Sequence, residues 1–220
     1  GGTNAEALTA EARARGLAMI GTVKAVKLYG GIEIETPLDP SAQPFLYDHA
    51  MEGTPLLPGV MATETFAEAA ALMAPGWHVA AVEHIQFSAP FKFYRMEPAT
   101  LYVSVTVIPA DGALIARCAL RSMRPPTKPG LPAQEKLHFT ADVRLTREAP
   151  EPLFAEVNLP APASLDIAPD RIYKVYFHGP AYQLLASAAV AGDEAIGLWA
   201  EGLPADTAEG EAAEVQRQVA

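Results

Sequence analysis

The sequence predicts an α+β fold in which a single antiparallel sheet wraps around one central helix. The first indication is residues 61–73, which contain no helix breaker and are apolar over most of a helical surface. The second is the order of alternating apolar and polar stretches, two before this segment and four after it. The third is a pair of short turns, Gly30-Gly31 and Asp111-Gly112, that join neighbouring strands. One curved sheet is the economical way to bury such a helix.

The stretch that precedes the central helix predicts a surface helix and a hairpin. Residues 5–18 are rich in Ala, Glu and Arg, which is typical of a surface helix or of a linker from a preceding domain. Residues 20–29 and 32–36 alternate valine and isoleucine with polar side chains, which predicts two paired strands. A loop over residues 37–44 then leads into an extended run that ends at His49.

The central helix is predicted to begin at Pro58-Gly59 and to end before Pro75-Gly76. On a helical wheel, Glu64 lies in the middle of an apolar stripe formed by Val60, Ala67 and Ala71. A carboxylate in such a stripe is costly unless it is paired, neutral or functional. Glu68 falls nearer the edge of the stripe and is expected to be wet.

Four further strands are predicted after the helix, at residues 77–87, 101–108, 114–123 and 137–145, with a Pro-rich loop at 125–132. Residues 150–169 hold several prolines and no glycine, which is typical of a semi-rigid linker. Beyond this linker, strands are predicted at residues 172–177, 182–190 and 195–201. The predicted organisation is a leading helix or linker (1–18), a first domain with the histidine (19–148), a linker (149–170) and a partial second domain (171–220).

Three groups around the start of the central helix suggest proton-transfer chemistry. His49 can act as a base near neutral pH, Glu64 can act as a buried acid, and the amides of Gly59 and Val60 can stabilise a developing oxyanion. A structural turn with a hydrogen-bonded histidine and a solvated glutamate explains the same spacing equally well.

Two motifs carry a family resemblance. The spacing His49-x-x-x-Gly53-x-x-x-x-Pro58 resembles the HxxxGxxxxP motif of dehydratase domains from polyketide and polyunsaturated fatty acid synthases. The run VYFHGPAYQ at residues 175–183 resembles the GYxYGPxF motif of the same family, with Val175, His178 and Tyr182 as departures. The resemblance spans roughly residues 20–200. It implies two hotdog folds in tandem, of which the first is complete here and the second is incomplete.

The resemblance also implies roles for individual residues. In that family, the histidine of the first hotdog removes the C2 proton of a 3-hydroxyacyl thioester, so His49 would be the catalytic base. Amides near Gly59 and Val60 would polarise the thioester carbonyl. The side chains of the second motif would line the pocket and orient the 3-hydroxyl, and the implied substrate-binding set is Gly53, Pro58, Gly59, Val60, Tyr176, His178 and Tyr182.

The catalytic acid is open between two possibilities. In the family, an aspartate of the second hotdog helps to expel the hydroxyl, and this sequence has no counterpart of that motif, since Asp206 lies in a polar stretch without its pattern. Glu64 is the alternative, because the glutamate that follows Pro-Gly-Val has this role in stand-alone bacterial hotdog dehydratases.

Composition and charge limit the classes of partner. Half of the 220 residues are hydrophobic, and the net charge of −10 argues against nucleic acid. Residues 151–220 hold 11 acidic and 3 basic residues, which leaves 15 and 13 for residues 1–150. An acidic carrier protein would therefore dock on the first part. The candidate basic patches are Lys24, Lys27, Lys92 and Arg95, or Arg121, Arg124 and Lys128; scattered solubilising charge is an equal alternative.

Other site classes find little support. Cys118 is the only cysteine, and no His, Cys, Asp or Glu spacing is typical of a metal site. No apolar run is long enough for a membrane span and no signal peptide is recognisable, which indicates the cytoplasm. The histidines at 78, 84 and 138 are expected to be structural or exposed, and Ser122 and Ser187 lack the context of a serine nucleophile.

The sequence thus predicts a 3-hydroxyacyl-[acyl carrier protein] dehydratase of polyketide or fatty acid biosynthesis. It would need no cofactor, because the substrate is carried on the phosphopantetheine of an acyl carrier protein. Its partners would be that carrier, neighbouring synthase domains and a second copy of this chain, paired through a sheet edge of the first hotdog. The alternatives are a hotdog thioesterase, an enoyl isomerase or cyclase, and a non-catalytic acyl-binding domain.

Overall fold

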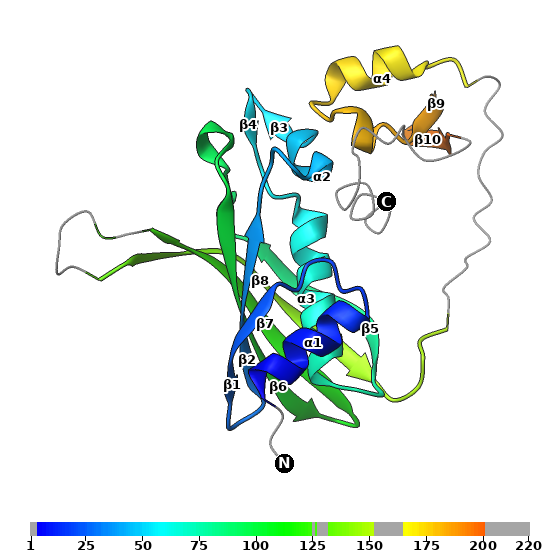
Figure 1. Cartoon of the computed structure of the whole chain (residues 1–220). Helices are drawn as coiled ribbons and strands as arrows, with labels where there is room; N and C mark the ends of the chain where they lie inside the picture. The colour runs from blue at the N-terminus through cyan, green and yellow to red at the C-terminus, as the bar shows by residue number, and fades with distance from the viewer. Residues whose placement is uncertain (1–3, 125, 127–131, 152–164, 201–220) are drawn as a thin grey trace. The chain divides into compact units, whose positions relative to one another are not determined.

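The computed structural model describes residues 4–124, 126, 132–151 and 165–200 (Figure 1). The chain divides into two compact units that do not follow chain order. The sheet unit comprises Gly1–Leu38, Leu57–Lys92 and Pro98–Glu151. The histidine unit comprises Asp39–Leu56, Phe93–Glu97 and Pro152–Ala220. His49 therefore belongs to the same unit as the second sequence motif.

The sheet unit contains a six-stranded antiparallel sheet with the strand order β1-β2-β6-β7-β8-β5. Its strands are β1 (Thr22–Lys27), β2 (Gly31–Leu38), β5 (His78–Phe87), β6 (Ala99–Ala110), β7 (Ala113–Arg124) and β8 (Gln134–Thr146). Both predicted hairpins are present. The first turns at residues 28–30, so Gly31 lies in β2 and not in the predicted Gly30-Gly31 turn. The β6–β7 turn places Asp111 at φ 37° and Gly112 at φ 80°, as a two-residue type I′ turn requires. The predicted strands and their antiparallel pairing are confirmed.

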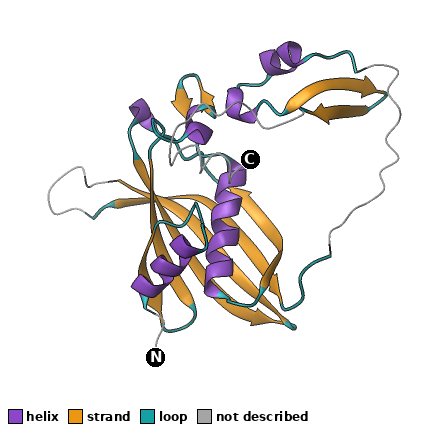
Figure 2. Ribbon diagram, turned by 45° about the vertical axis from the view of Figure 1, so that its right-hand side comes forward, coloured by secondary structure: helices purple, strands orange, loops and turns teal. Residues whose placement is uncertain are grey.

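The central helix α3 (Gly59–Met73) lies along the concave face of this sheet (Figure 2). Its buried residues are Met61, Ala62, Thr65, Phe66, Ala69, Ala70 and Leu72. The buried side chains of the sheet include Leu101, Val103, Leu120, Val143 and Leu145. Burial of this many apolar groups is the main stabilising term of the unit, and one sheet around one helix confirms the hotdog fold.

The burial of the two glutamates on α3 differs from the prediction. Glu64 and Val60 are exposed, with 70% of Val60 accessible, so the predicted apolar stripe around Glu64 is wrong. Glu68 is half-buried instead, and its Oε2 accepts a hydrogen bond of 2.8 Å from the Met19 amide. The segment that follows α1 (Ala5–Ala14) covers this part of α3, which a helical wheel cannot show because the covering residues are remote in sequence.

The histidine unit is built from short elements. Its first part contains α2 (Pro44–Tyr47), β3 (Ala50–Met51), β4 (Thr54–Pro55) and the 3-10 helix η1 (Tyr94–Met96). Its second part contains α4 (Pro169–Val175), the 3-10 helix η2 (Pro180–Tyr182), β9 (Leu185–Ala191) and β10 (Glu194–Trp199). Among residues 165–200, β9 and β10 form a two-stranded sheet, which agrees with an incomplete second hotdog.

Two predicted elements of this unit are wrong. The extended run before His49 is the helix α2, in which Pro44 takes the first helical position. The predicted strand at residues 172–177 is largely the helix α4, which places Pro169 and Asp170 in its first turn and pairs Asp170 with Lys174 one turn later. Both helices begin at a proline that follows an extended residue, and this start signal outweighs the β propensity of the aromatic residues.

Several predictions fall outside the described residues. These are most of the Pro-rich loop at 125–132, residues 152–164 of the predicted linker, and everything from residue 201 onward. The predicted strand at 182–190 begins later, at Leu185, because Pro180–Tyr182 form a 3-10 turn. Within the described part of the chain, no helix is long and apolar enough to span a bilayer.

The half-buried carboxyl of Glu68 predicts a pH-dependent stability. Burial raises its pKa from 4.5 to about 7, against the opposing hydrogen bond from Met19. A pKa raised by folding adds stability that is present below the unfolded pKa and is lost as the pH rises through 7. The free energy of unfolding of the wild type should therefore fall by roughly 1–2 kcal/mol between pH 5 and pH 8, after allowance for the solvent that reaches the carboxyl. Glu68→Gln should flatten this dependence in urea unfolding, and an unchanged slope would contradict the assignment.

Candidate functional site

His49 is held at the end of a small hairpin. The Leu56 amide donates to the His49 carbonyl at 2.9 Å, which closes the β3–β4 ladder. The His49 Nδ1 lies 3.0 Å from the Leu56 carbonyl oxygen. A carbonyl oxygen only accepts, so Nδ1 carries the proton of the neutral ring. The Nε2 atom then has a free lone pair, which is the form that a general base requires.

The residue before the histidine attaches the second motif to this hairpin. Asp48 is buried, and its Oδ2 accepts a hydrogen bond of 2.8 Å from the Ala181 amide. The Asp48 carbonyl accepts a second hydrogen bond, of 2.7 Å, from the Gly179 amide. A Cβ atom on Gly179 would meet Asp48 Oδ1 at 2.5 Å, so only glycine permits this approach. Tyr182 adds a third bond, from its hydroxyl to the Phe45 carbonyl at 2.6 Å.

Three rings of the second motif surround His49. The ring centroid of Phe177 lies 5.0 Å from that of His49, His178 lies at 5.5 Å, and Tyr182 lies at 5.7 Å. His178 also stacks on Phe177, with centroids 4.4 Å apart and ring planes 17° apart. A histidine with one free nitrogen thus sits in an aromatic surrounding with a second imidazole beside it.

This surrounding shifts the acid–base properties of two groups. Burial lowers the pKa of His49 from the ordinary 6.5, the hydrogen bond to the Leu56 carbonyl opposes that shift, and the nearby His178 lowers it further. The neutral, basic form of His49 is therefore favoured near pH 7. Burial also raises the pKa of the Tyr182 hydroxyl, with a smaller contribution from the Asp48 carboxylate, so this phenol stays protonated.

A hollow of about 440 Å³ lies within the same unit. It is lined by Tyr47, Asp48, Ala50, Gly53, Met96, Phe177 and Gly179. Its wall combines apolar side chains with the two segments that the Asp48 hydrogen bonds join. A hollow of this size can hold a short acyl or pantetheine segment.

The structure brings together part of the predicted site. His49, His178 and Tyr182 form one cluster, and Tyr176 lies at its margin, 56% exposed, with its centroid 6.0 Å from that of His178. Gly53 forms the hairpin turn at φ 74°, a conformation that favours glycine, and it lines the hollow. Gly53 therefore contributes to the site through its backbone conformation, which forms the turn.

The remaining predicted residues belong to the sheet unit. Pro58 precedes the first turn of α3, and Gly59 begins it. A Cβ on Gly59 would lie 2.9 Å from the Phe87 ring, which explains glycine at this position. Val60 and Glu64 are exposed on the same helix. The sheet unit therefore does not desolvate Glu64, which was the physical reason for expecting it to act as an acid.

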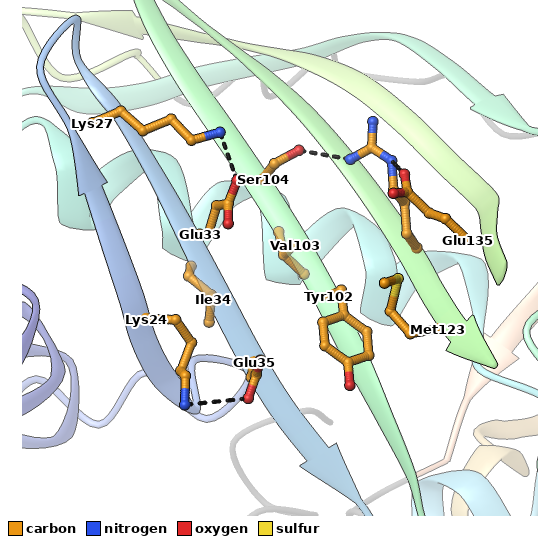
Figure 3. A pocket seen from close by; sticks show the side chains of 11 residues that line it. Lys24, Lys27, Glu33, Ile34, Glu35, Tyr102, Val103, Ser104, Met123 and Glu135 are labelled. Carbon is orange, nitrogen blue, oxygen red and sulfur yellow. Dashed lines mark hydrogen bonds and ion pairs between the residues drawn. The ribbon is translucent and has the colours of Figure 1, made fainter. Parts of the chain in front are cut away.

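Three of the cations in the two predicted basic patches, Lys24, Lys27 and Arg121, form ion pairs with glutamates. Lys24 and Lys27 of β1 reach Glu35 and Glu33 of β2, with N–O distances of 3.6 and 2.6 Å (Figure 3). Arg121 pairs with Glu135 on the same face of the sheet. These cations line a shallow hollow together with the glutamates that offset them. This face offers little net positive charge to an acidic carrier protein.

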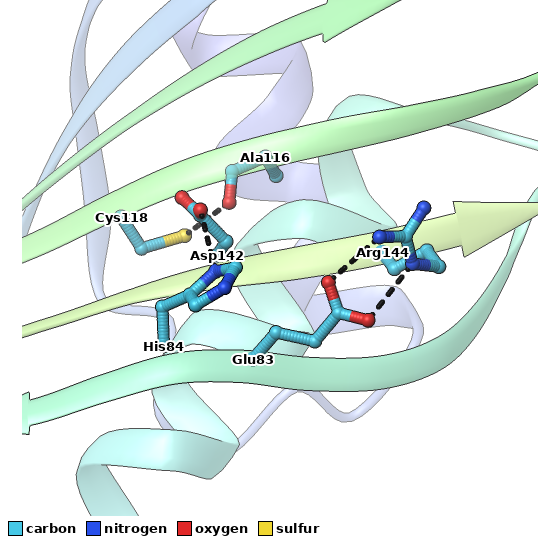
Figure 4. Close-up of polar contacts among 6 residues, drawn as sticks. All are labelled: Glu83, His84, Ala116, Cys118, Asp142 and Arg144. Carbon is cyan, nitrogen blue, oxygen red and sulfur yellow. Dashed lines mark hydrogen bonds and ion pairs between the residues drawn. The ribbon is translucent and has the colours of Figure 1, made fainter. Parts of the chain in front are cut away.

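The other histidines and the cysteine have structural surroundings. His84 is exposed and lies 3.2 Å from Asp142, next to the two-bond pair of Glu83 with Arg144 (Figure 4). Cys118 is buried, and burial raises the pKa of its thiol to about 12, with a smaller contribution from Asp142. A thiol in this state is not a nucleophile near neutral pH.

One serine–histidine pair was not predicted. Ser122 Oγ lies 2.8 Å from His138 Nε2, while His138 Nδ1 approaches the carbonyls of Ala89 and Pro90. The His138 carbonyl also accepts from the Ser88 amide. His138 is buried and is bound through both its ring and its main chain to the loop after β5, so we interpret the pair as structural. Across the described residues, no group of three potential metal ligands occurs.

Sequence reasoning missed two contributors to the site, Asp48 and Phe177. Asp48 is adjacent to the histidine in sequence, but its partners lie more than 130 residues further along the chain. Phe177 occupies an unspecified position of the second motif, and only the fold shows that its ring is the one nearest to His49. The available signal was the aspartate directly before the candidate base, because a carboxylate that is buried beside such a site requires hydrogen-bond partners.

The comparisons agree with this architecture. Residues 22–117 match the family model of the polyketide synthase dehydratase domain. The family resemblance is therefore confirmed for the part of the chain that holds the first motif, and the second motif at residues 175–183 lies outside the matched residues. A comparison with the sequences of curated proteins finds no match.

Solved structures with the same fold are also polyketide synthase dehydratase domains. The domain from the CurF module of the curacin synthase has a TM-score of 0.68 and 16% identity, over 85% of this chain and 66% of that one. A dehydratase studied for substrate selection in the borrelidin and fluvirucin synthases has a TM-score of 0.58 and 24% identity, over 85% of this chain and 65% of that one. A variant of the PpsC dehydratase domain from Mycobacterium tuberculosis has a TM-score of 0.64 and 20% identity, over 91% of this chain and 66% of that one. The chain thus spans slightly less than two thirds of these structures.

Removal of the Asp48 carboxylate should release the second motif from the hairpin. Asp48→Ala leaves the Ala181 amide without its charged acceptor, which should cost about 2 kcal/mol of local stability. We expect faster hydrogen exchange at the Gly179 and Ala181 amides, measured by mass spectrometry or NMR. Asp170→Ala is the matched control, because its carboxylate is exposed and its ion pair among the described residues is with Lys174. Equal exchange in both variants would contradict the role of Asp48.

Proposed function

We propose that this chain is a dehydratase domain of a polyketide synthase, and that it removes water from a 3-hydroxyacyl thioester to give a 2-enoyl thioester. The observation that carries the proposal is the state of His49. Its Nδ1 proton is donated to the Leu56 carbonyl, so Nε2 is unprotonated, and the ring lies beside His178 and Tyr182 of the second motif. The match of residues 22–117 to the dehydratase family supports the same function.

In the proposed reaction, His49 takes the proton from C2 of the acyl chain. The low pKa of His49 keeps the ring neutral near pH 7, so it can accept that proton. On the family resemblance, we propose that the amides of Gly59 and Val60 stabilise the negative charge that develops on the thioester oxygen. Gly53 forms the turn that follows His49, and Pro58 precedes the first turn of α3. Tyr176 and Tyr182 line the space that receives the acyl chain.

The elimination of water is redox-neutral, so the proposal includes no redox cofactor. The acyl group arrives on the phosphopantetheine of an acyl carrier protein, within a synthase that contributes neighbouring domains. Because Lys24, Lys27 and Arg121 are already paired with glutamates, we place the carrier away from that face of the sheet. Function in the cytoplasm is part of the same proposal.

We further propose that two copies of the chain associate through a sheet edge of the first hotdog. The edges are formed by β1 and β5, whose outer backbone groups lack a strand partner within the sheet. Light scattering at micromolar concentration should then give twice the chain mass, and a monomer would contradict this proposal.

The dehydratase activity should depend on His49. A 3-hydroxyacyl pantetheine thioester incubated with the protein should lose water, as measured by mass spectrometry. His49→Ala should lower the rate by roughly 10²–10⁴-fold, because a positioned base contributes that much. His84→Ala is the control, since His84 is exposed and belongs to the sheet unit. Release of free thiol would instead indicate a thioesterase, a shifted double bond an isomerase, and binding without turnover a non-catalytic domain.

The rate should also depend on pH in a particular direction. Because burial lowers the pKa of His49 below 6.5, the neutral base persists to more acidic pH than for a free histidine. The acidic limb of kcat/KM should therefore have its midpoint below pH 6.5. A midpoint above that value would show that His49 is stabilised as the cation and would argue against its role as the base.

A further inference from the structure

We propose that Tyr182 is a positioning residue for the base His49, and that its hydroxyl acts by holding α2, the short helix directly before the base. This inference rests on the proposed dehydratase function. It deepens that function, because it assigns the Tyr182 hydroxyl to the main chain of α2 and not to the substrate. The ring of Tyr182 remains beside the imidazole, as the family motif implies for a side chain of the pocket.

The Tyr182 hydroxyl has a defined partner. It donates a hydrogen bond of 2.6 Å to the carbonyl oxygen of Phe45, a residue 137 positions earlier in the chain. Both residues belong to the histidine unit. Burial raises the pKa of this phenol, with a smaller contribution from the Asp48 carboxylate, so the hydroxyl keeps its proton near neutral pH. A phenol has a single proton to donate, and α2 receives it.

The Phe45 carbonyl needs a donor from outside its own helix. α2 comprises only four residues, Pro44–Tyr47, and the carbonyls in the last turn of a helix lack an intrahelical partner. The amide four positions after Phe45 is that of His49, and it donates to the Leu46 carbonyl instead, at 3.2 Å. Phe45 is buried, which limits the access of water to its carbonyl. The Tyr182 hydroxyl therefore caps α2 from a distant part of the chain.

This bond gives α2 a second point of attachment. Asp48, directly after α2, binds the amides of Gly179 and Ala181. Phe45 lies within the helix, three residues earlier. Three residues of a helix rise about 4.5 Å and turn by about 300°, so the two attachments are separated on the helix surface. A short rigid element that is attached at one point can pivot, whereas a second attachment fixes its orientation.

The orientation of α2 is transmitted directly to His49. The His49 amide is bonded to the Leu46 carbonyl of α2, and the His49 Nδ1 lies 3.0 Å from the Leu56 carbonyl oxygen. The Tyr182 ring also lies against the imidazole, with centroids 5.7 Å apart and ring planes 60° apart. A rotation of α2 would therefore move His49 relative to the carbonyl that fixes its tautomer. Displacement of a base by about 1 Å is enough to lower a rate severely.

The hydroxyl is a departure from the family motif. The dehydratase motif that residues 175–183 resemble has phenylalanine where this chain has Tyr182. A phenylalanine provides the same ring but has no donor for the Phe45 carbonyl. Tyr182→Phe thus removes one hydrogen bond, keeps the aromatic contacts and restores the residue of the motif. This variant is expected to fold.

Tyr173 provides a matched control. Its hydroxyl accepts a hydrogen bond of 2.8 Å from the Leu185 amide. Tyr173 is half-buried and belongs to the histidine unit, as Tyr182 does. This bond joins α4 to β9, and His49 takes no part in it. Tyr173→Phe therefore removes a bonded hydroxyl of the same kind without releasing α2.

The first measurement uses NMR and needs no turnover. In wild type, the ¹⁵N signals of the neutral His49 ring should show one tautomer, with the proton on Nδ1. Tyr182→Phe should move these signals toward the tautomer mixture of an unconstrained histidine. Exchange of the Asp48 and His49 amides should become roughly fivefold faster, which corresponds to the loss of one hydrogen bond. Tyr173→Phe should match wild type in both readouts, and a match of Tyr182→Phe to wild type would overturn the proposal.

The second measurement is the rate of water loss from a 3-hydroxyacyl pantetheine thioester. Tyr182→Phe should lower kcat roughly tenfold and leave KM within about twofold, because the base is displaced and no substrate contact is lost. Tyr173→Phe should stay within about twofold of wild type in both constants. A raised KM with unchanged kcat in Tyr182→Phe would show that the hydroxyl binds substrate. An equal loss of kcat in the two variants would show a general structural effect. Either result would overturn the positioning role.

The outcomes also separate this proposal from the dehydratase function on which it rests. If wild type loses no water, the dehydratase function fails, and the NMR signals and amide exchange still decide whether Tyr182 holds His49. If His49→Ala abolishes water loss while Tyr182→Phe retains the full kcat, His49 is the base and the positioning role of Tyr182 is wrong.

Discussion

The site depends on one buried carboxylate. Asp48 accepts a hydrogen bond from the Ala181 amide through its side chain and another from the Gly179 amide through its carbonyl. These two bonds bring together segments that lie about 130 residues apart, and they do so at the residue that precedes the proposed base His49. The absence of a side chain on Gly179 is part of the same constraint, because a Cβ atom there would occupy the space of the carboxylate. The His49 environment therefore exists only when both motifs are folded together.

The spacing of the first motif follows from hairpin geometry. β3 and β4 pair residue 50 with 55 and residue 51 with 54, so the turn consists of Glu52 and Gly53. Their φ angles of 51° and 74° are those of a tight two-residue turn, and the second position favours glycine. With this register, Leu56 lies opposite His49, and its amide and carbonyl bind the main chain and the ring of the histidine. The three residues between His49 and Gly53 therefore set the hairpin register in which the Leu56 carbonyl lies at the Nδ1 atom of His49.

The sequence predicted those features whose cause is local or periodic. The six strands, both glycine-containing hairpins and the limits of α3 follow from alternation and from breakers near the helix ends. The sequence did not predict which glutamate of α3 is buried, because burial of Glu68 depends on Met19 and on the N-terminal helix. It also missed α4, where aromatic residues suggested a strand although Pro169 and Asp170 begin a helix. At the site, the motifs identified His49, His178 and Tyr182, whereas the role of Asp48 required knowledge of a distant partner.

The two imidazole rings of the cluster have different surroundings. His49 is tied through Nδ1 to a carbonyl, lies edge-on to Phe177 and is partly withdrawn from water, and all of this leaves one free nitrogen on a neutral ring. His178 instead lies flat on Phe177, on the segment that the Asp48 carboxylate holds in place. The hydrogen bond to the Leu56 carbonyl fixes the tautomer of His49, whereas the described contacts of the His178 ring are with aromatic rings.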